Sequence, residues 1–182
     1  MDFIKKNPKI FIISGKARSG KGEASNIIKN YYKNKKTIII SFGHYIKDYA
    51  MRVSDWDGNE ENKPRELLQQ LGIELIKNRI DNKLFIKRIL EDILVFSYFY
   101  DIIIVNDARL IDEVESLKNA YPNSISIRIN RINYENGMTD KENNHKTEID
   151  LDNYNNFDYL VLNDNYNNLK NQIELILKEV SL

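Results

Sequence analysis

Two glycines and a lysine near the amino end have the spacing of a phosphate-binding loop. Gly15, Gly20 and Lys21 form the pattern G-x-x-x-x-G-K, directly after an apolar run at positions 10–13. In such a loop the backbone N–H groups surround phosphate oxygens, and the helix that follows points the positive end of its dipole at them. The lysine reaches the β- and γ-phosphates of the nucleotide. The pattern therefore predicts that ATP binds here through its phosphates.

The residues predicted to bind ATP form one continuous stretch. They are Gly15, Lys16, Ala17, Arg18, Ser19, Gly20, Lys21, Gly22 and Glu23. Gly22 departs from the usual pattern, because it stands where a serine or threonine hydroxyl commonly binds Mg²⁺. A glycine-rich turn between a strand and a helix, with no ligand, is the alternative interpretation of this stretch.

A carboxylate and a guanidinium follow a later apolar run. Asp107 and Arg109 come directly after positions 102–105. Carboxylate oxygens suit Mg²⁺, which keeps several of its waters, so Asp107 is predicted to hold this ion directly or through water. The planar guanidinium of Arg109 is suited to bind phosphate oxygens in pairs. The alternative is that Asp107 caps the next helix and Arg109 lies at the solvent edge.

An amphipathic pattern at positions 64–79 carries a second set of candidate binding residues. Its apolar face consists of Leu67, Leu68, Leu71 and Leu75. Arg65, Gln69 and Gly72 share the opposite face at helical spacing. An arginine, an amide and bare backbone on one face could bind an acceptor phosphate and a flat base. An ordinary amphipathic helix is the alternative interpretation.

A polar, asparagine-rich segment at positions 132–147 is long for a loop in a compact domain. We predict a lid here, with Arg131 at its root. An arginine delivered by a closing lid can neutralise charge on a phosphoryl group during its transfer. Arg128 is a weaker candidate, because it alternates with apolar residues inside a strand pattern. A surface loop without a role and a solvated arginine are the alternatives.

The elements that must position these residues alternate along the chain. Five short apolar runs, rich in Ile, Val and Tyr, look like strands buried on both faces, at positions 10–14, 37–41, 102–105, 124–129 and 159–162. Helical patterns lie at positions 21–32, 44–51, 64–79, 83–98, 110–120 and 166–180. This alternation predicts a single α/β domain over 1–182 with a parallel sheet, and the phosphate loop at the carboxyl ends of the strands.

The composition excludes a broad attraction to nucleic acid or to an anionic membrane, because 27 basic and 27 acidic residues give a net charge of +0. The cysteine count of 0 excludes disulfides and thiol chemistry. No apolar stretch has the pattern of a signal peptide or a transmembrane helix. We therefore expect a cytoplasmic protein whose partner is a small molecule, not a membrane or a nucleic acid polymer; a homodimer is left open.

Several pieces, in this order, resemble the bacteriophage-type deoxynucleoside monophosphate kinases. They are the loop at 15–21, the segments at 64–72 and 107–109, the stretch at 145–151 and the ending at 157–164. The resemblance implies a P-loop NTPase fold of the nucleoside monophosphate kinase type, with an acceptor-binding helical region at about 43–82 and a lid at about 132–147. It implies transfer of the ATP γ-phosphoryl group to a (deoxy)nucleoside monophosphate, with Mg²⁺ as a cofactor.

The resemblance also implies roles for individual residues. Lys21 and the loop backbone would hold ATP, and Arg65 and Arg109 would face the acceptor phosphate. Arg131 would belong to the lid, and Lys47 matches a lysine that follows the second strand in this family.

Two departures from the family leave the acceptor open. Gly22 stands where the family often has Asp, and Phe42-Gly43-His44 stands where it usually reads Phe-Ala-Asp. Animal-type phosphomevalonate kinases share a similar loop and a similar Asp-x-Arg tip. The alternatives are therefore a related kinase acting on another phosphorylated small molecule, such as phosphomevalonate or dephospho-coenzyme A, and a regulatory protein that binds ATP without catalysis.

Overall fold

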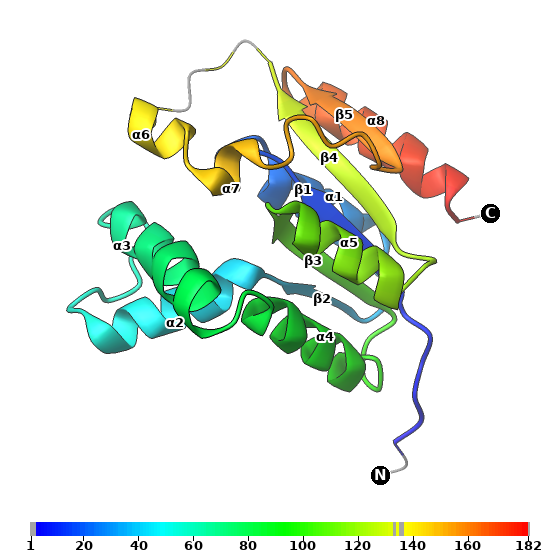
Figure 1. Cartoon of the computed structure of the whole chain (residues 1–182). Helices are drawn as coiled ribbons and strands as arrows, with labels where there is room; N and C mark the ends of the chain where they lie inside the picture. The colour runs from blue at the N-terminus through cyan, green and yellow to red at the C-terminus, as the bar shows by residue number, and fades with distance from the viewer. Residues whose placement is uncertain (1–2, 133, 135–136, 182) are drawn as a thin grey trace.

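The sheet is entirely parallel and lies at the centre of the molecule. Figure 1 shows the computed structural model, which describes residues 3–132, 134 and 137–181. The strands are β1 (Lys9–Ser14), β2 (Thr37–Ile40), β3 (Ile102–Ala108), β4 (Ile125–Arg131) and β5 (Tyr159–Asn163). They form a 5-stranded sheet in the order β2-β3-β1-β4-β5, with every neighbouring pair parallel. The predicted α/β fold class is confirmed. The predicted lid includes positions 133, 135 and 136, which lie outside the described residues.

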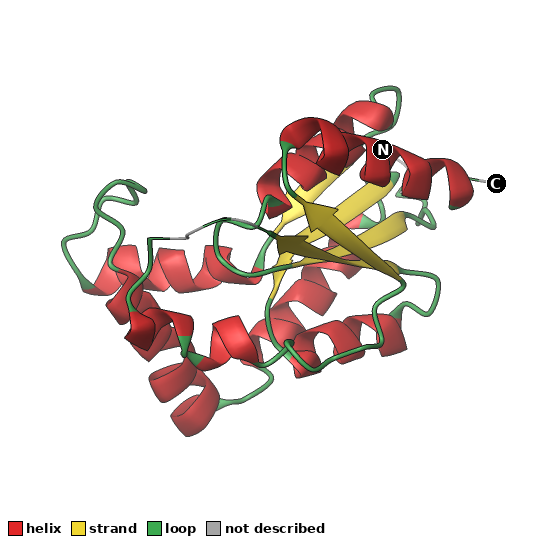
Figure 2. Ribbon diagram, turned by 90° about the horizontal axis from the view of Figure 1, so that it is seen from above, coloured by secondary structure: helices red, strands yellow, loops and turns green. Residues whose placement is uncertain are grey.

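Helices cover both faces of this sheet (Figure 2). One face packs against α1 (Lys21–Tyr31) and α8 (Tyr166–Glu179), and the other against α4 (Leu84–Phe96) and α5 (Ile111–Ala120). The central strand β1 shows why its sequence does not alternate: Phe11 and Ile13 enter one core while the neighbouring isoleucines enter the other. A strand buried on both faces has no side that needs polar residues.

Three helices form a unit beside the β2 edge of the sheet. They are α2 (Phe42–Val53), α3 (Arg65–Gln69) and η1 (Gln70–Ile80). Ser41 caps α2 by accepting a hydrogen bond from the backbone N–H of His44 at 3.2 Å, so α2 begins two residues before the predicted helix.

The prediction of one regular α-helix over 64–79 is wrong. The helix widens into a π-helix at Gln70, whose hydrogen bonds reach one residue further along the chain than in an α-helix. The wider turn changes which residues face inward. Gly72 and Ile76 are buried, whereas Leu75, predicted on the apolar face, is 42% exposed.

The segment between β4 and β5 contains two short helices, α6 (Asp140–Asn143) and α7 (Lys146–Ile149). Thr139 and Glu142 cap α6 reciprocally, each side chain accepting from the backbone N–H of the other residue. Among the described residues, no helix is long and apolar enough to cross a membrane.

Candidate active site

The phosphate loop follows a path that admits no side chain at two of its glycines. A Cβ added at Gly15 would lie 2.4 Å from Ser19 Oγ and 2.6 Å from a backbone oxygen of β4. A Cβ at Gly20, where φ is +103°, would lie 2.5 Å from Asn163 Nδ2. The glycines of the pattern are therefore needed for the close approach of the loop to the ends of β4 and β5.

Asn163 anchors this loop. Its buried side chain, at the end of β5, donates a hydrogen bond from Nδ2 to the backbone oxygen of Ser19 at 2.9 Å. Asn163 has no role that its local sequence would predict. Asparagine is abundant in the chain, and only the folded sheet brings β5 beside the loop.

Lys21 lies over the loop in a dry environment. Its Nζ donates hydrogen bonds to the backbone oxygens of Gly15 at 2.8 Å and Lys16 at 2.7 Å. Burial, followed by the nearby Arg109 guanidinium, lowers the pKa of Lys21 from 10.5 to about 7. A phosphate bound nearby would supply negative charge and so favour the charged form of Lys21.

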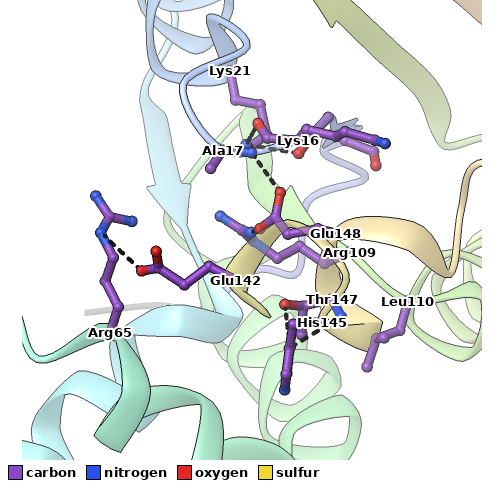
Figure 3. A network of polar contacts seen from close by, with 12 residues as sticks. Lys16, Ala17, Lys21, Arg65, Arg109, Leu110, Glu142, His145, Thr147 and Glu148 are labelled. Atoms are coloured by element: carbon purple, nitrogen blue, oxygen red, sulfur yellow. Dashed lines mark hydrogen bonds and ion pairs between the residues drawn. The ribbon is translucent and has the colours of Figure 1, made fainter. Parts of the chain in front are cut away.

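A buried carboxylate contacts the same loop (Figure 3). Glu148, 4% exposed on α7, accepts a hydrogen bond from the backbone N–H of Ala17 at 2.8 Å and forms an ion pair with Arg109. The amide of Ala17 is therefore already paired within the protein. The sequence analysis quoted Glu148 only as part of a stretch and gave it no role.

The tip of β3 is held from two sides. Asp107 accepts hydrogen bonds from the backbone N–H groups of Phe42 and Gly43, both at 2.8 Å. It therefore caps α2 and not the helix that follows it, which was the alternative considered from the sequence. The described residues contain no group of three side chains suited to bind a metal ion. The prediction that Asp107 holds Mg²⁺ stays a prediction, with both carboxylate oxygens engaged by backbone.

Glu113, on α5, holds the backbone beside this tip. Its Oε2 accepts from the N–H groups of Arg109 at 2.8 Å and Leu110 at 3.1 Å. Burial raises the pKa of Glu113 to about 7. The backbone at Arg109 is thus fixed independently of its side chain.

A cavity of about 380 Å³ opens between the phosphate loop, the tip of β3 and the unit of α2, α3 and η1. The predicted acceptor residues Lys47, Arg65 and Gln69 line it together with Lys21 and Arg109. Its apolar walls include Phe42, Ile46, Leu68, Phe85 and Ile86. Further cations and amides that the sequence analysis did not select are Lys63, Lys77, Asn82 and Asn106. The cavity is thus partly apolar, and both cations and acidic residues (Asp81, Asp107, Glu113 and Glu148) line it.

Solved structures share this architecture. No protein-family model and no curated protein matches the sequence. The chain is similar to TT1252 from Thermus thermophilus (TM-score 0.58, 11% identity, 96% of this chain and 98% of that one). It is also similar to the shikimate kinase of Aquifex aeolicus (0.52, 13%, 94% and 98%) and to the APS kinase of Mycobacterium tuberculosis (0.51, 9%, 97% and 99%). The chain has a P-loop kinase fold.

The segment that the sequence predicts as a lid contacts α3 through two ion pairs. Arg65 of α3 pairs with Glu142 of α6 at 4.0 Å (Figure 3), and the adjacent Glu66 pairs with Lys141 at 2.6 Å. In one pair the cation lies on α3, and in the other it lies on α6. A shift of α6 along α3 would bring like charges together, so the two pairs favour the present alignment of these helices. Met138, within this segment, lines the cavity.

Arg131 lies apart from the acceptor cavity. Its guanidinium stacks on the ring of Tyr134, 3.9 Å from the centroid, and donates to the backbone oxygen of Arg18 at 3.1 Å. Arg131 therefore touches the phosphate loop, on the side that faces β4. Its predicted role toward a transferring phosphoryl group stays a prediction.

Arg128, the weaker candidate from the sequence, is buried beside the loop. It is 6% exposed, and its guanidinium donates to Ser14 Oγ at 3.0 Å and pairs with Asp152 at 3.3 Å. Asp152 also pairs with Lys16 at 2.7 Å. These contacts hold the Arg128 guanidinium beside the loop, where little of it is exposed.

Proposed function

We propose that this protein is a kinase that transfers the γ-phosphoryl group of ATP to a (deoxy)nucleoside monophosphate. One observation carries the proposal: the ammonium of Lys21 and the guanidinium of Arg109 lie where the phosphate loop meets a cavity lined by further cations. Two groups of phosphates, one on the loop and one in the cavity, would meet between these two side chains. Positive charge around the transferring group is what phosphoryl transfer requires.

The loop fits ATP. Its glycines leave room for a polyphosphate close to the backbone, at the N-terminal end of α1. The fit to Mg²⁺ is poorer, since Gly22 supplies no hydroxyl and both oxygens of Asp107 bind backbone amides. The described residues therefore favour an ion that arrives bound to the ATP phosphates and keeps its waters.

The chain's own side chains would act by positioning. Lys21 and the loop amides hold the ATP phosphates, and Arg65 and Lys47 hold the acceptor phosphate. An acceptor phosphate oxygen is anionic near neutral pH, so no general base is needed. Alignment of the ATP and acceptor phosphates, together with fixed positive charge around them, then accelerates the transfer. The lid over the cavity excludes water and so limits hydrolysis of ATP.

The walls of the cavity support a nucleotide as the acceptor. Phe42 and Phe85 offer aromatic surface, and Gln69 and Asn82 offer amides that can donate to and accept from a base. A flat, polar-edged ring suits this combination better than an aliphatic acid does. The coarser proposal, a kinase with a phosphorylated small-molecule acceptor, does not depend on this choice.

A coupled assay of ADP release tests the proposal. Wild-type protein is incubated with Mg·ATP and each of a panel of nucleoside monophosphates in ribose and deoxyribose forms, with phosphomevalonate and dephospho-coenzyme A included. We expect turnover on at least one nucleoside monophosphate. Turnover on another acceptor alone would move the proposal to that substrate. ATP binding by calorimetry without turnover on any acceptor would favour a regulatory nucleotide-binding protein.

A further inference from the structure

Glu148 joins two parts of the site that the chain brings together from distant positions. Its Oε2 binds the backbone N–H of Ala17 on the phosphate loop, and its Oε1 pairs with the guanidinium of Arg109. Building on the proposed function, we propose that Glu148 is a positioning residue that holds the Arg109 guanidinium against the phosphate loop. Arg109 can then face the ATP phosphates and the acceptor phosphate from one fixed place.

The backbone that carries Glu148 is itself fixed. The ring of His145 accepts from the backbone N–H of Thr147 at the start of α7. Asp150 accepts a hydrogen bond from the backbone N–H of Ile111, at the start of α5, at 2.8 Å. Leu151 is buried in the core beneath. These contacts leave the Glu148 carboxylate little freedom to leave the loop.

The other end of the pair is also fixed at its backbone. Glu113 accepts a hydrogen bond from the N–H of Arg109, so only the side chain of Arg109 can change its conformation freely. That side chain is 30% exposed, and a guanidinium has several donors on different edges. Glu148 engages one edge and leaves the others for phosphate oxygens.

Charge supplies the reason for a carboxylate at this point. Lys21, Arg109 and Arg128 are cations near one another, and the anions that face them are Asp107, Asp152 and Glu148. Arg109 opposes the charge on Lys21, whereas Glu148 and Asp107 favour it. Asp107 is held by α2, and Asp152 lies on the far side by Arg128 and Lys16. Glu148 is thus the anion that contacts both the loop and Arg109.

The same contacts allow a different role for Glu148, which predicts the opposite effect when its charge is removed. A carboxylate on a loop amide could be a stand-in for phosphate that ATP must displace. Removing its charge would then tighten ATP binding and raise the rate. Removing the charge of a positioning residue lowers kcat, because Arg109 loses its fixed direction.

A double-mutant cycle in kcat separates these roles. Glu148→Gln, Arg109→Ala and the double variant are compared with wild type on the acceptor found in the panel assay. We expect Glu148→Gln to lower kcat by about 10²-fold, since a misplaced group near the reacting atoms costs about that much. In the Arg109→Ala background the same change should cost no more than about twofold, because the group through which Glu148 acts is gone.

Two further variants serve as controls for the effect of Glu148→Gln. Glu174→Gln removes an exposed carboxylate that pairs with Lys170 on α8, and it should leave kcat unchanged. Glu148→Asp keeps the charge but is one methylene shorter, so it should reach one partner and lose less rate than Glu148→Gln. Thermal unfolding of each variant is measured first. If neither Glu148 variant folded, a structural role would suffice and the proposal would be overturned.

The remaining outcomes distinguish this proposal from the proposed function. Equal losses in both backgrounds, or a Glu148→Gln variant faster than wild type, would overturn the positioning role in an active kinase. Absence of turnover by wild type would overturn the proposed function instead. The cycle would then be measured as dissociation constants for Mg·ATP by calorimetry, where additive effects again count against the coupling of Glu148 to Arg109.

Discussion

Lys21 shows how a single side chain is prepared for a ligand. Its ammonium lies against two backbone oxygens of its own loop, and burial together with Arg109 opposes its charge. Phosphates bound at the loop would offset both effects, because their negative charge favours the charged form of Lys21.

Replacing Lys21 by alanine should lower kcat by about 10²- to 10³-fold, the usual loss when a donor to developing charge is removed. The measurement is the steady-state rate at saturating ATP and acceptor. Lys170→Ala serves as the matched control, since Lys170 lies on α8 and pairs only weakly, at 3.8 Å, with Glu174. Unchanged rates in the Lys21 variant would remove this lysine from the transfer step.

The lowered pKa of Lys21 predicts a pH dependence. The charged form binds phosphate, and the free protein loses that charge as the pH rises through about 7. The value of kcat/KM for ATP should therefore fall about tenfold per pH unit above this point. The fall in kcat should begin at higher pH, because bound phosphates raise the pKa of Lys21. A kcat/KM profile that is flat to alkaline pH would contradict the environment described for this lysine.

At the scale of elements, the tip of β3 connects three helices. Asp107 caps α2, Glu113 of α5 holds the backbone of Arg109, and the Arg109 side chain reaches α7. This tip therefore contacts both α2, in the unit beside β2, and α7, which overlaps the predicted lid. The close approach also explains Gly43, where a Cβ would lie 2.9 Å from Asp107 Oδ2.

Asp107→Asn should lower the free energy of unfolding by about 1 kcal/mol, because an amide retains one acceptor oxygen for two backbone N–H groups. Denaturant unfolding measures this loss. Asp48→Asn, which changes an exposed partner of Arg52 on α2, is the control. A rise in the Mg²⁺ concentration needed for half-maximal rate would show that Asp107 also holds the ion, whereas unchanged stability would argue against the cap.

At the scale of the whole molecule, the strand order gathers the site at one edge. β1 lies between β3 and β4, so the phosphate loop after β1 meets the tip of β3 on one side and the root of the lid on the other. The segment after β4 then meets α3 through the ion pairs Arg65–Glu142 and Glu66–Lys141. Figure 1 shows α6 above α3, although β3 and β4 lie between these two helices in the chain.

Reversing one lid charge should weaken closure. Lys141→Glu places a second carboxylate beside Glu66, and we expect KM for the acceptor to rise only about two- to fivefold, because the pair is exposed. Adding Glu66→Lys should restore KM, because the pair is remade with opposite polarity. Steady-state kinetics at low and high salt measure this, and the effect should shrink with salt. A double variant as impaired as the single one would mean that these residues do not meet during turnover.

Much of the scaffold could be predicted because its signals are local. The phosphate loop follows from three residues at fixed spacing, and the parallel sheet follows from apolar runs that lack alternation, as in β1. The π-helix after Gln70 could not be predicted in this way. A 3.6-residue period places Leu75 inside. In the structure the wider turn buries Gly72 instead, where an added Cβ would lie 3.1 Å from Ile46 Cδ1.

The contacts that make the site were beyond the reach of spacing rules. Ala17 and Glu148 are 131 residues apart, and Ser19 and Asn163 are 144 apart, so no local pattern records either hydrogen bond. The residues of one loop determine a ligand class because neighbours in the chain share one backbone path. Which carboxylate faces which cation depends on how distant segments pack, and that arrangement gives Arg109 its direction and Lys21 its depressed pKa.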